Sequence, residues 1–287
     1  MVHGDVQLPV IAVRPMEGRT GTTLLMQLLA TSPEIVFDDR YPSEYRFLSY
    51  FRRLAELATE PFDEHRHRGV TAFFFGDVLE FGPVPFRSDV IDTRELRDPL
   101  VGGMWGACST LIRQQHPNVR YYAEKLAVPV DDDLRRAVPL RVIDLVRDPR
   151  DVLCSIRGFT ASGQGEDGFG AADETATLAY VSRFADRTKS QLDVMLQDRD
   201  SETRQLVRYE DMIADLDGIA HRLGTWLDVT LDGDAVIANR DHYRHHMSSP
   251  SIESSVSRWR KELTSTESEL LADRLGDHLR QLGYETT

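Results

Sequence analysis

The loop Gly18-Arg19-Thr20-Gly21-Thr22-Thr23 could bind an anion. It follows the apolar run Leu8–Val13 and opens a Leu-rich segment that reads as a helix. Strand, glycine loop and helix start together form a phosphate cradle, because glycines let the backbone approach the anion and the unpaired amides of the helix start donate to it. Arg19 adds a fixed cation, and Thr22 and Thr23 add hydroxyl donors. An ordinary strand-to-helix turn with a threonine N-cap would explain the same residues equally well.

The loop lacks the features of a nucleoside-triphosphate site. That motif reads G-x-x-x-x-G-K-[ST], with its Lys on the terminal phosphates. If Gly21 is its last glycine, Met16 stands where the first glycine belongs and Thr22 where the Lys is required. A nucleotide remains plausible, but ATP or GTP with Mg²⁺ is not favoured.

A second stretch with the same chemistry is Arg147-Asp148-Pro149-Arg150-Asp151, directly after the apolar run Leu140–Val146. A continuous apolar run is typical of a parallel strand buried on both faces, and Pro149 suits the first position of a helix. Arg147 would then stand at the carboxyl end of a strand, where open α/β sheets bind ligands. Ser155 comes eight residues later, about two helical turns, so it can lie on the same side of that helix.

Strands and helices alternate around these two stretches. This pattern predicts a three-layer α/β fold, a P-loop-like domain with a mostly parallel central sheet flanked by helices, spanning residues 1–287 as a single domain. The other predicted strands are Ile35–Phe37, Val119–Ala123 and Arg204–Arg208. The other predicted helices begin at Thr22 and Ser43 or span Trp105–His116, Asp131–Ala137, Glu174–Gln197, Met212–Leu227 and Ser265–Leu282.

Three segments are predicted to be irregular. Residues 61–104 read as an insertion or lid over an acceptor pocket, residues 158–173 hold five glycines and read as a mobile loop, and residues 230–264 read mostly as loop. His65 and His67 alternate within the first of these segments without a third ligand nearby, so we expect a solvated pair and no metal.

Composition excludes several classes of protein. The net charge of −13 argues against nucleic acid or an anionic membrane as partner, so an anionic ligand needs a local basic pocket. Cys108 and Cys154 form no disulfide or zinc pattern. No segment reads as a signal peptide or a membrane span, so a cytoplasmic enzyme is expected. The sequence gives no indication of oligomeric state.

With two cradles in this order, the chain resembles sulfotransferases that use 3′-phosphoadenosine 5′-phosphosulfate (PAPS), in particular the bacterial and carbohydrate-type branch. In that family the first loop reads P-[KR]-[ST]-G-[ST]-[TS], and here Gly18 takes the place of the Pro. The family's R-[ND]-P-[KR]-D-x-x-x-S is matched without a gap from Arg147 to Ser155.

Two later motifs extend the resemblance, which runs from about residue 8 to 263. The segment Arg208-Tyr209-Glu210-Asp211 is similar to R-Y-E-D, with which the adenine-side strand often ends. The segment Ser255-Val256-Ser257-Arg258-Trp259-Arg260 is similar to S-[VI]-G-R-W-R, with Ser257 in place of Gly. Each motif alone is weak, whereas four in order are specific.

The resemblance implies a role for each matching residue. Arg19 and Lys125 would bind the transferring sulfuryl group as catalytic cations. Arg147, Ser155 and Arg258 would hold the 3′-phosphate. The remaining nucleotide-binding residues would be Thr20, Gly21, Thr22, Thr23, Tyr209, Ser255 and Trp259. No metal is implied, because preorganised cations and amides stabilise charge on the peripheral oxygens during in-line transfer.

The base departs from the cytosolic pattern K-T-H-L-P, because Ala127 stands where its His would be. Glu124-Lys125 is similar instead to the E-K-T-P segment of bacterial and carbohydrate-type members, several of which use a Glu between the first two helices. Glu44 is the first choice, with Asp38 and Asp39 as alternatives and a plain helix-capping role as the other reading of Glu44. The acceptor would be a hydroxyl of a small molecule, sugar or natural product. A nucleotide kinase or hydrolase and a non-catalytic nucleotide-binding domain are the alternatives.

Overall fold

The computed structural model describes residues 7–38, 45–59, 92–126, 130–163, 169–197, 201–238 and 253–286. The chain divides into two compact units. The sheet unit comprises residues 11–44, 121–125 and 141–287, and the helical unit comprises residues 1–10, 45–120 and 126–140.

A five-stranded sheet with the strand order β2-β3-β1-β4-β5 forms the centre of the sheet unit. The strands are β1 (Val10–Pro15), β2 (Ile35–Val36), β3 (Tyr121–Lys125), β4 (Leu140–Val146) and β5 (Arg204–Arg208). The β2–β3 and β4–β5 pairs are parallel, and Val146 at the end of β4 lies opposite Arg208 at the end of β5. The predicted mostly parallel sheet is confirmed.

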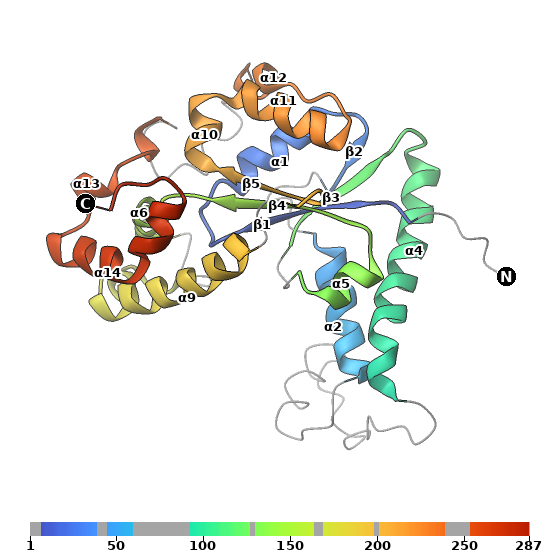
Figure 1. Cartoon of the computed structure of the whole chain (residues 1–287), viewed down its shortest axis with the longest axis horizontal. Helices are drawn as coiled ribbons and strands as arrows, with labels where there is room; N and C mark the ends of the chain where they lie inside the picture. The colour runs from blue at the N-terminus through green and yellow to red at the C-terminus, as the bar shows by residue number, and fades with distance from the viewer. Residues whose placement is uncertain are drawn as a thin grey trace. The chain divides into compact units, whose positions relative to one another are not determined.

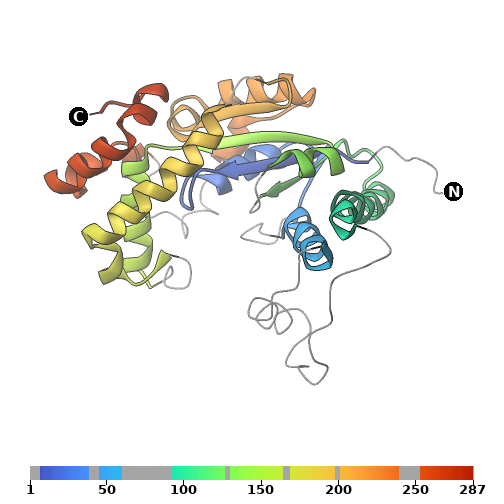
Figure 2. The same ribbon diagram turned by 60° about the horizontal axis from the view of Figure 1, so that its bottom comes forward.

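Helices cover both faces of this sheet, which confirms the three-layer prediction (Figure 1). Along β1, Ile11 and Val13 belong to the core of one face, while the alternate residues point to the other face. The helices of the first face are α1 (Thr22–Ala30), α10 (Tyr209–Ala214), α11 (Leu216–Leu227) and α12 (Gly233–Ala238). Those of the second face are α6 (Pro149–Ala161), α9 (Leu178–Gln197) and α14 (Ser265–Gln281). In Figure 2 α9 and α14 lie side by side.

A buried ion triad joins three strands on the second face. Asp144 of β4 is fully buried, and its carboxylate accepts from Arg14 Nε of β1 at 2.6 Å and from Arg204 Nε of β5. Arg204 also donates to the carbonyls of Val194 and Met195 in α9. The triad therefore links the sheet to the helix that covers it.

Two predicted helices are each interrupted. The prediction Glu174–Gln197 corresponds to α8 (Ala172–Thr175) and α9, and Met212–Leu227 corresponds to α10 and α11. Asp215 separates the latter pair, because its backbone leaves the helical region and its side chain accepts the Gly218 N–H, which caps α11. Periodicity alone does not reveal such a cap inside an apolar pattern.

The predicted irregular segments contain more helix than expected. The structure describes the range 230–264 in part, and there it forms α12, the 3-10 helix η4 (Glu253–Ser255) and α13 (Trp259–Glu262). The predicted mobile loop 158–173 is likewise helical at its start, because α6 continues to Ala161, and at its end in α8. Residues 164–168 lie outside the described residues.

The helical unit contains α2 (Phe47–Thr59), the 3-10 helix η2 (Thr93–Leu96), α4 (Arg97–Gln115) and α5 (Asp132–Ala137). The helices α2 and α4 lie side by side (Figures 1 and 2). The prediction that residues 97–104 are irregular is wrong, because α4 begins at Arg97. Pro99 lies in the first turn, where its missing N–H costs nothing, and Gly102 allows close approach to the Ala137 carbonyl. The rest of the predicted lid, including His65 and His67, lies outside the described residues.

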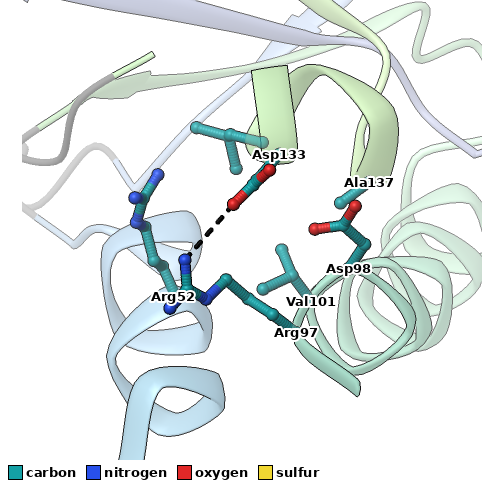
Figure 3. Close-up of a pocket in the computed structure, with 7 residues that line it drawn as sticks. Arg52, Arg97, Asp98, Val101, Asp133 and Ala137 are labelled. Carbon is teal, nitrogen blue, oxygen red and sulfur yellow. Dashed lines mark hydrogen bonds and ion pairs between the residues drawn. The ribbon is translucent and has the colours of Figure 1, made fainter. Parts of the chain in front are cut away.

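A small cleft lies between these helices and α5 (Figure 3). Arg52 binds Asp131 with two hydrogen bonds of 2.9 and 2.6 Å, and Arg97 pairs with Asp133 at 3.2 Å. The cleft therefore lies within a network of ion pairs that joins α2 and α4 to α5.

Candidate active site

The first predicted cradle is a tight left-handed turn between β1 and α1. Arg19 and Gly21 both adopt positive φ, of 67° and 102°. Gly21 is the N-cap of α1, and no side chain caps the helix. The reading of this loop as an ordinary turn with a threonine N-cap is therefore wrong. A Cβ at Gly21 would overlap the ring of Tyr209, so glycine permits both the turn and this packing.

The loop is braced from within and from outside. The Thr20 hydroxyl donates to the Glu17 carbonyl at 2.5 Å. The Glu17 side chain pairs with Arg187 of α9 at 2.5 Å, and burial raises the pKa of this carboxyl although Arg187 opposes the change. Thr22 opens α1 as expected, and Thr23 follows in its first turn.

The second cradle lies where β4 meets α6. Asp148 is the N-cap of α6 and accepts the Arg150 N–H, and Pro149 occupies the first turn as predicted. Ser155 is buried within α6, and its hydroxyl lies 3.4 Å from Arg19 Nε. The spacing of eight residues thus does bring Ser155 to the side of the helix that faces the first loop.

The guanidinium of Arg147 joins the two predicted anion sites. It donates to the Arg19 carbonyl at 2.9 Å and to the Ser255 carbonyl at 2.7 Å. It also stacks 4.4 Å from the ring centroid of Tyr209, whose hydroxyl lies 2.8 Å from that of Ser255. Arg147 is buried, and its Nε has no hydrogen-bond partner within the described part of the chain.

Asp151 fixes the segment that carries Arg258. Its carboxylate accepts the Ser257 N–H at 2.7 Å and the Trp259 N–H at 2.9 Å. Ser257 has a positive φ of 59°, so the segment turns sharply, which is consistent with the glycine of the family motif at this position. Burial raises the pKa of Asp151 to about 6, although the Trp259 N–H lowers it. Asp151 was not singled out from the sequence, where it was only one letter of a motif.

Two predicted nucleotide-binding residues are engaged with neighbours in this segment. Two guanidinium groups stack on the ring of Trp259, with Arg150 Cζ 3.7 Å and Arg260 Cζ 4.6 Å from its centroid. Arg258 donates to Glu262 at 2.8 Å along α13. The Trp259 side chain thus packs against arginines, while its backbone N–H binds Asp151.

Glu210 is a further residue that sequence reasoning missed. Its carboxylate accepts the Asp148 N–H at 2.9 Å and the Tyr284 hydroxyl at 2.7 Å. Burial raises the pKa of Glu210 although the Asp148 N–H lowers it. This acid of the R-Y-E-D segment therefore ties the start of α10 to the start of α6 and to the C-terminal segment.

Of the residues predicted to take part in sulfuryl transfer, the structure describes only some. Lys125 is buried at the carboxyl end of β3, the neighbour of β1 in the sheet. Asp38 is half-buried just after β2. Glu44, Asp39 and Ala127 lie outside the described residues. The described residues contain no group of three or more His, Cys, Asp or Glu side chains that could hold a metal ion.

The fold places both predicted anion-binding loops after strands of an open α/β sheet, at the carboxyl edge where such sheets bind ligands. Residues 17–233 match the sulfotransferase family, and the chain therefore belongs to this family. This match confirms the predicted class, a sulfotransferase.

Two solved structures share the fold over nearly the whole chain. The sulfotransferase domain from the curacin biosynthetic pathway is 17% identical, with a TM-score of 0.52, and the match covers 97% of this chain and 99% of that one. The sulfotransferase domain of the Synechococcus PCC 7002 olefin synthase is 14% identical, with a TM-score of 0.53 and coverage of 98% and 97%. No curated protein matches the chain. Along the described residues no helix is both long and apolar enough to cross a membrane.

Proposed function

We propose that this sulfotransferase moves the sulfuryl group of PAPS to a hydroxyl of a small molecule, sugar or natural product, with Glu44 as base. The observation that carries the proposal is the position of Arg147, whose guanidinium binds the carbonyls of both Arg19 and Ser255. A donor with a phosphate at one end and a phosphosulfate at the other needs two anion sites at a fixed separation, and this side chain links the two.

The two ends of the donor would use different residues. The loop of Thr20, Gly21, Thr22 and Thr23 would receive the 5′-phosphosulfate through its amides and hydroxyls. Arg147, Ser155 and Arg258 would bind the 3′-phosphate, for which Arg is suited because it donates two parallel hydrogen bonds. Tyr209 and Ser255 support Arg147 by the stack and the carbonyl contact described above. Trp259 would complete this side by orienting Arg150 and Arg260.

The transfer step would be an in-line displacement at sulfur. The acceptor oxygen forms a bond to sulfur while the bond from sulfur to the bridging oxygen of the 5′-phosphate breaks, and that bridging oxygen takes the electron pair. Arg19 and Lys125 would stabilise the charge on the transferring group and the leaving phosphate, and each such donor contributes about 3 kcal/mol. The proton of the acceptor hydroxyl would pass to the Glu44 carboxylate.

The base assignment is tested by Glu44→Gln, with Asp38→Asn and Asp39→Asn as matched controls. Loss of a general base lowers turnover by about 10²- to 10⁴-fold, so we expect this loss for Glu44→Gln alone, with unchanged affinity for 3′-phosphoadenosine 5′-phosphate (PAP). If one of the Asp variants shows the loss instead, that Asp is the base. If no variant changes turnover, a non-catalytic nucleotide-binding role gains support.

The donor assignment is tested by calorimetric titration with PAP and by transfer of ³⁵S from labelled PAPS to a panel of phenols, alcohols and sugars. We expect PAP to bind the wild-type protein and Arg147→Ala to abolish measurable binding. Absence of PAP binding to the wild type would refute the proposal. Mg²⁺-dependent ATP turnover by the pure protein would favour the kinase or hydrolase alternative.

The sequence supports proposals about the compartment, the source and the partners of this enzyme. We propose a cytoplasmic, bacterial enzyme with no nucleic-acid partner, based on the net charge of −13 and on the branch that the motifs resemble. The range 61–104 would be the acceptor-binding insertion. The whole chain would act as one sulfotransferase domain.

A further inference from the structure

Gly18, the residue at which the first loop departs from its family pattern, lies directly under an aromatic ring. A Cβ on Gly18 would stand 2.5 Å from Cζ and 2.7 Å from Cε1 of Phe169. No side chain fits there unless the ring moves. A proline, the family's residue at this position, would meet the same ring.

Phe169 in turn supports a second ring. The rings of Phe169 and Phe159 meet edge to face, with centroids 6.2 Å apart and planes at 84°. This is a favoured geometry for an aromatic pair. Phe159 belongs to α6, one turn after Ser155, so the pair connects the phosphosulfate loop to the helix of the second cradle.

The guanidinium of Arg19 stacks on the second ring, that of Phe159. Arg19 Cζ lies 4.3 Å from the centroid of Phe159, well within the range of a cation–π interaction. The hydrogen bond from Arg19 Nε to Ser155 is long, at 3.4 Å. Arg19 also has a strained backbone with φ of 67°, and its carbonyl is held by Arg147. Arg147 thus holds the backbone of Arg19, and Phe159 holds the plane of its guanidinium.

We propose that Phe169 and Phe159 are positioning residues that set the direction of Arg19, and that Gly18 is glycine because the ring of Phe169 occupies its side-chain space. The inference rests on the proposed role of Arg19 at the 5′-phosphosulfate. In this chain the ring of Phe169 can take its place against Phe159 because residue 18 has no side chain.

The first test compares PAP, which carries a phosphate at both ends, with two ligands that each carry only one end of the donor. For Phe169→Leu and Phe159→Leu we expect affinity for PAP and for adenosine 5′-phosphosulfate to fall about fivefold, as for loss of an oriented cation–π contact. Affinity for adenosine 3′-monophosphate, which lacks the 5′ group, should stay unchanged. Leu279→Ala is the control for core packing, because this fully buried residue of α14 belongs to the core cluster against which Phe169 packs. It should lower the melting temperature and leave all three affinities unchanged. Equal weakening of all three ligands by Phe169→Leu would overturn the inference.

The second test fills the space between residue 18 and the ring of Phe169. Gly18→Ala should weaken PAP binding about tenfold in the wild-type background, because the ring and the Arg19 stack must shift. In a Phe169→Ala background, the same Gly18→Ala change should have no further effect. If Gly18→Ala weakens binding equally in both backgrounds, the glycine is not there for the ring and the inference fails.

A third measurement separates this inference from the proposed function. If the wild-type protein binds neither PAP nor adenosine 5′-phosphosulfate, the proposed function fails, yet the position of Arg19 can still be observed. The Nε–H resonance of Arg19, identified by its loss in Arg19→Lys, should carry a ring-current shift that Phe159→Leu removes and Phe169→Leu reduces. An Arg19 resonance that both variants leave unchanged would refute the positioning role whatever the ligand.

Discussion

Asp151→Asn should separate folding stability from donor binding. The carboxylate accepts two backbone N–H groups, from Ser257 and Trp259, and an amide of the same shape can accept only one of them. The lost bond costs about 1–3 kcal/mol. Burial raises the pKa of Asp151 from 3.8 to about 6, so ionising this side chain in the folded protein costs about 3 kcal/mol, which the neutral amide avoids. We therefore expect the free energy of unfolding at about pH 8 to change little.

Binding should respond differently, because the segment held by Asp151 carries Arg258 and the Ser255 carbonyl on Arg147. With one N–H released, this segment shifts and PAP affinity should fall about tenfold, or about 1.4 kcal/mol. The first loop is coupled to this segment indirectly, through the Arg147 guanidinium, so affinity for adenosine 5′-phosphosulfate should fall less than affinity for PAP.

The raised pKa of Asp151 makes both the stability of the protein and its affinity for PAP depend on pH. Because the folded pKa lies above the unfolded one, the folded state binds this proton more tightly. The contribution of Asp151 to stability is therefore greatest below about pH 4 and is lost as the pH rises through about 6. Protonation also removes one of the two acceptors. The ratio of wild-type to Asp151→Asn affinity for PAP should thus fall from about ten toward one as the pH drops through about 6.

Calorimetric titration of PAP into both proteins between about pH 5 and pH 8 measures this ratio, and titration of the ligand's own phosphates cancels in it. Chemical denaturation at the same pH values measures stability. Parallel pH profiles for the two proteins, or an unchanged affinity for PAP in the variant, would refute the reasoning.

Three further changes have defined outcomes. Gly21→Ala should destabilise the protein by about 2 kcal/mol in urea unfolding, because φ is 102° and the methyl group would meet the ring of Tyr209; an unchanged midpoint would contradict this. Asp144→Asn should cost about 3–5 kcal/mol in the same assay, since it removes the buried carboxylate to which both arginines donate. Cys154, whose pKa burial raises to about 12, should resist iodoacetamide at about pH 8 in the native protein, and rapid labelling would show that the site opens.

The parts of the fold that rest on local chemistry were predictable. The five strands were predicted within two residues at each end. A continuous apolar run marked β4, as is typical of a buried parallel strand, and short runs rich in apolar residues marked the others. Pro149 marked the start of α6, and the eight-residue spacing placed Ser155 toward Arg19. These features depend on residues close in sequence, whose geometry the helix and the strand fix in advance.

The parts that depend on distant contacts were not predictable. The start of α4 at Arg97 was hidden by Pro99 and two glycines, although one glycine serves close packing against Ala137. Nothing in the glycine-rich segment indicated that Phe169 would cover Gly18. The roles of Asp151 and Glu210 likewise depend on N–H groups far along the chain. A carboxylate in a motif shows that an acid is needed, but not which backbone it holds.

The electrostatics of the site follow from how its acids are used. The chain carries a net charge of −13, so a donor with several negative charges must be attracted by a local excess of cations. Asp151 bonds to backbone N–H groups, and Arg147 donates to carbonyls; the described residues show no carboxylate bonded to Arg147. Carbonyl dipoles, and no bonded carboxylate among the described residues, therefore oppose the buried charge of Arg147, which is costly until a phosphate arrives. Donor binding would remove this cost, so the protein should gain more stability from PAP than from a ligand without the 3′-phosphate.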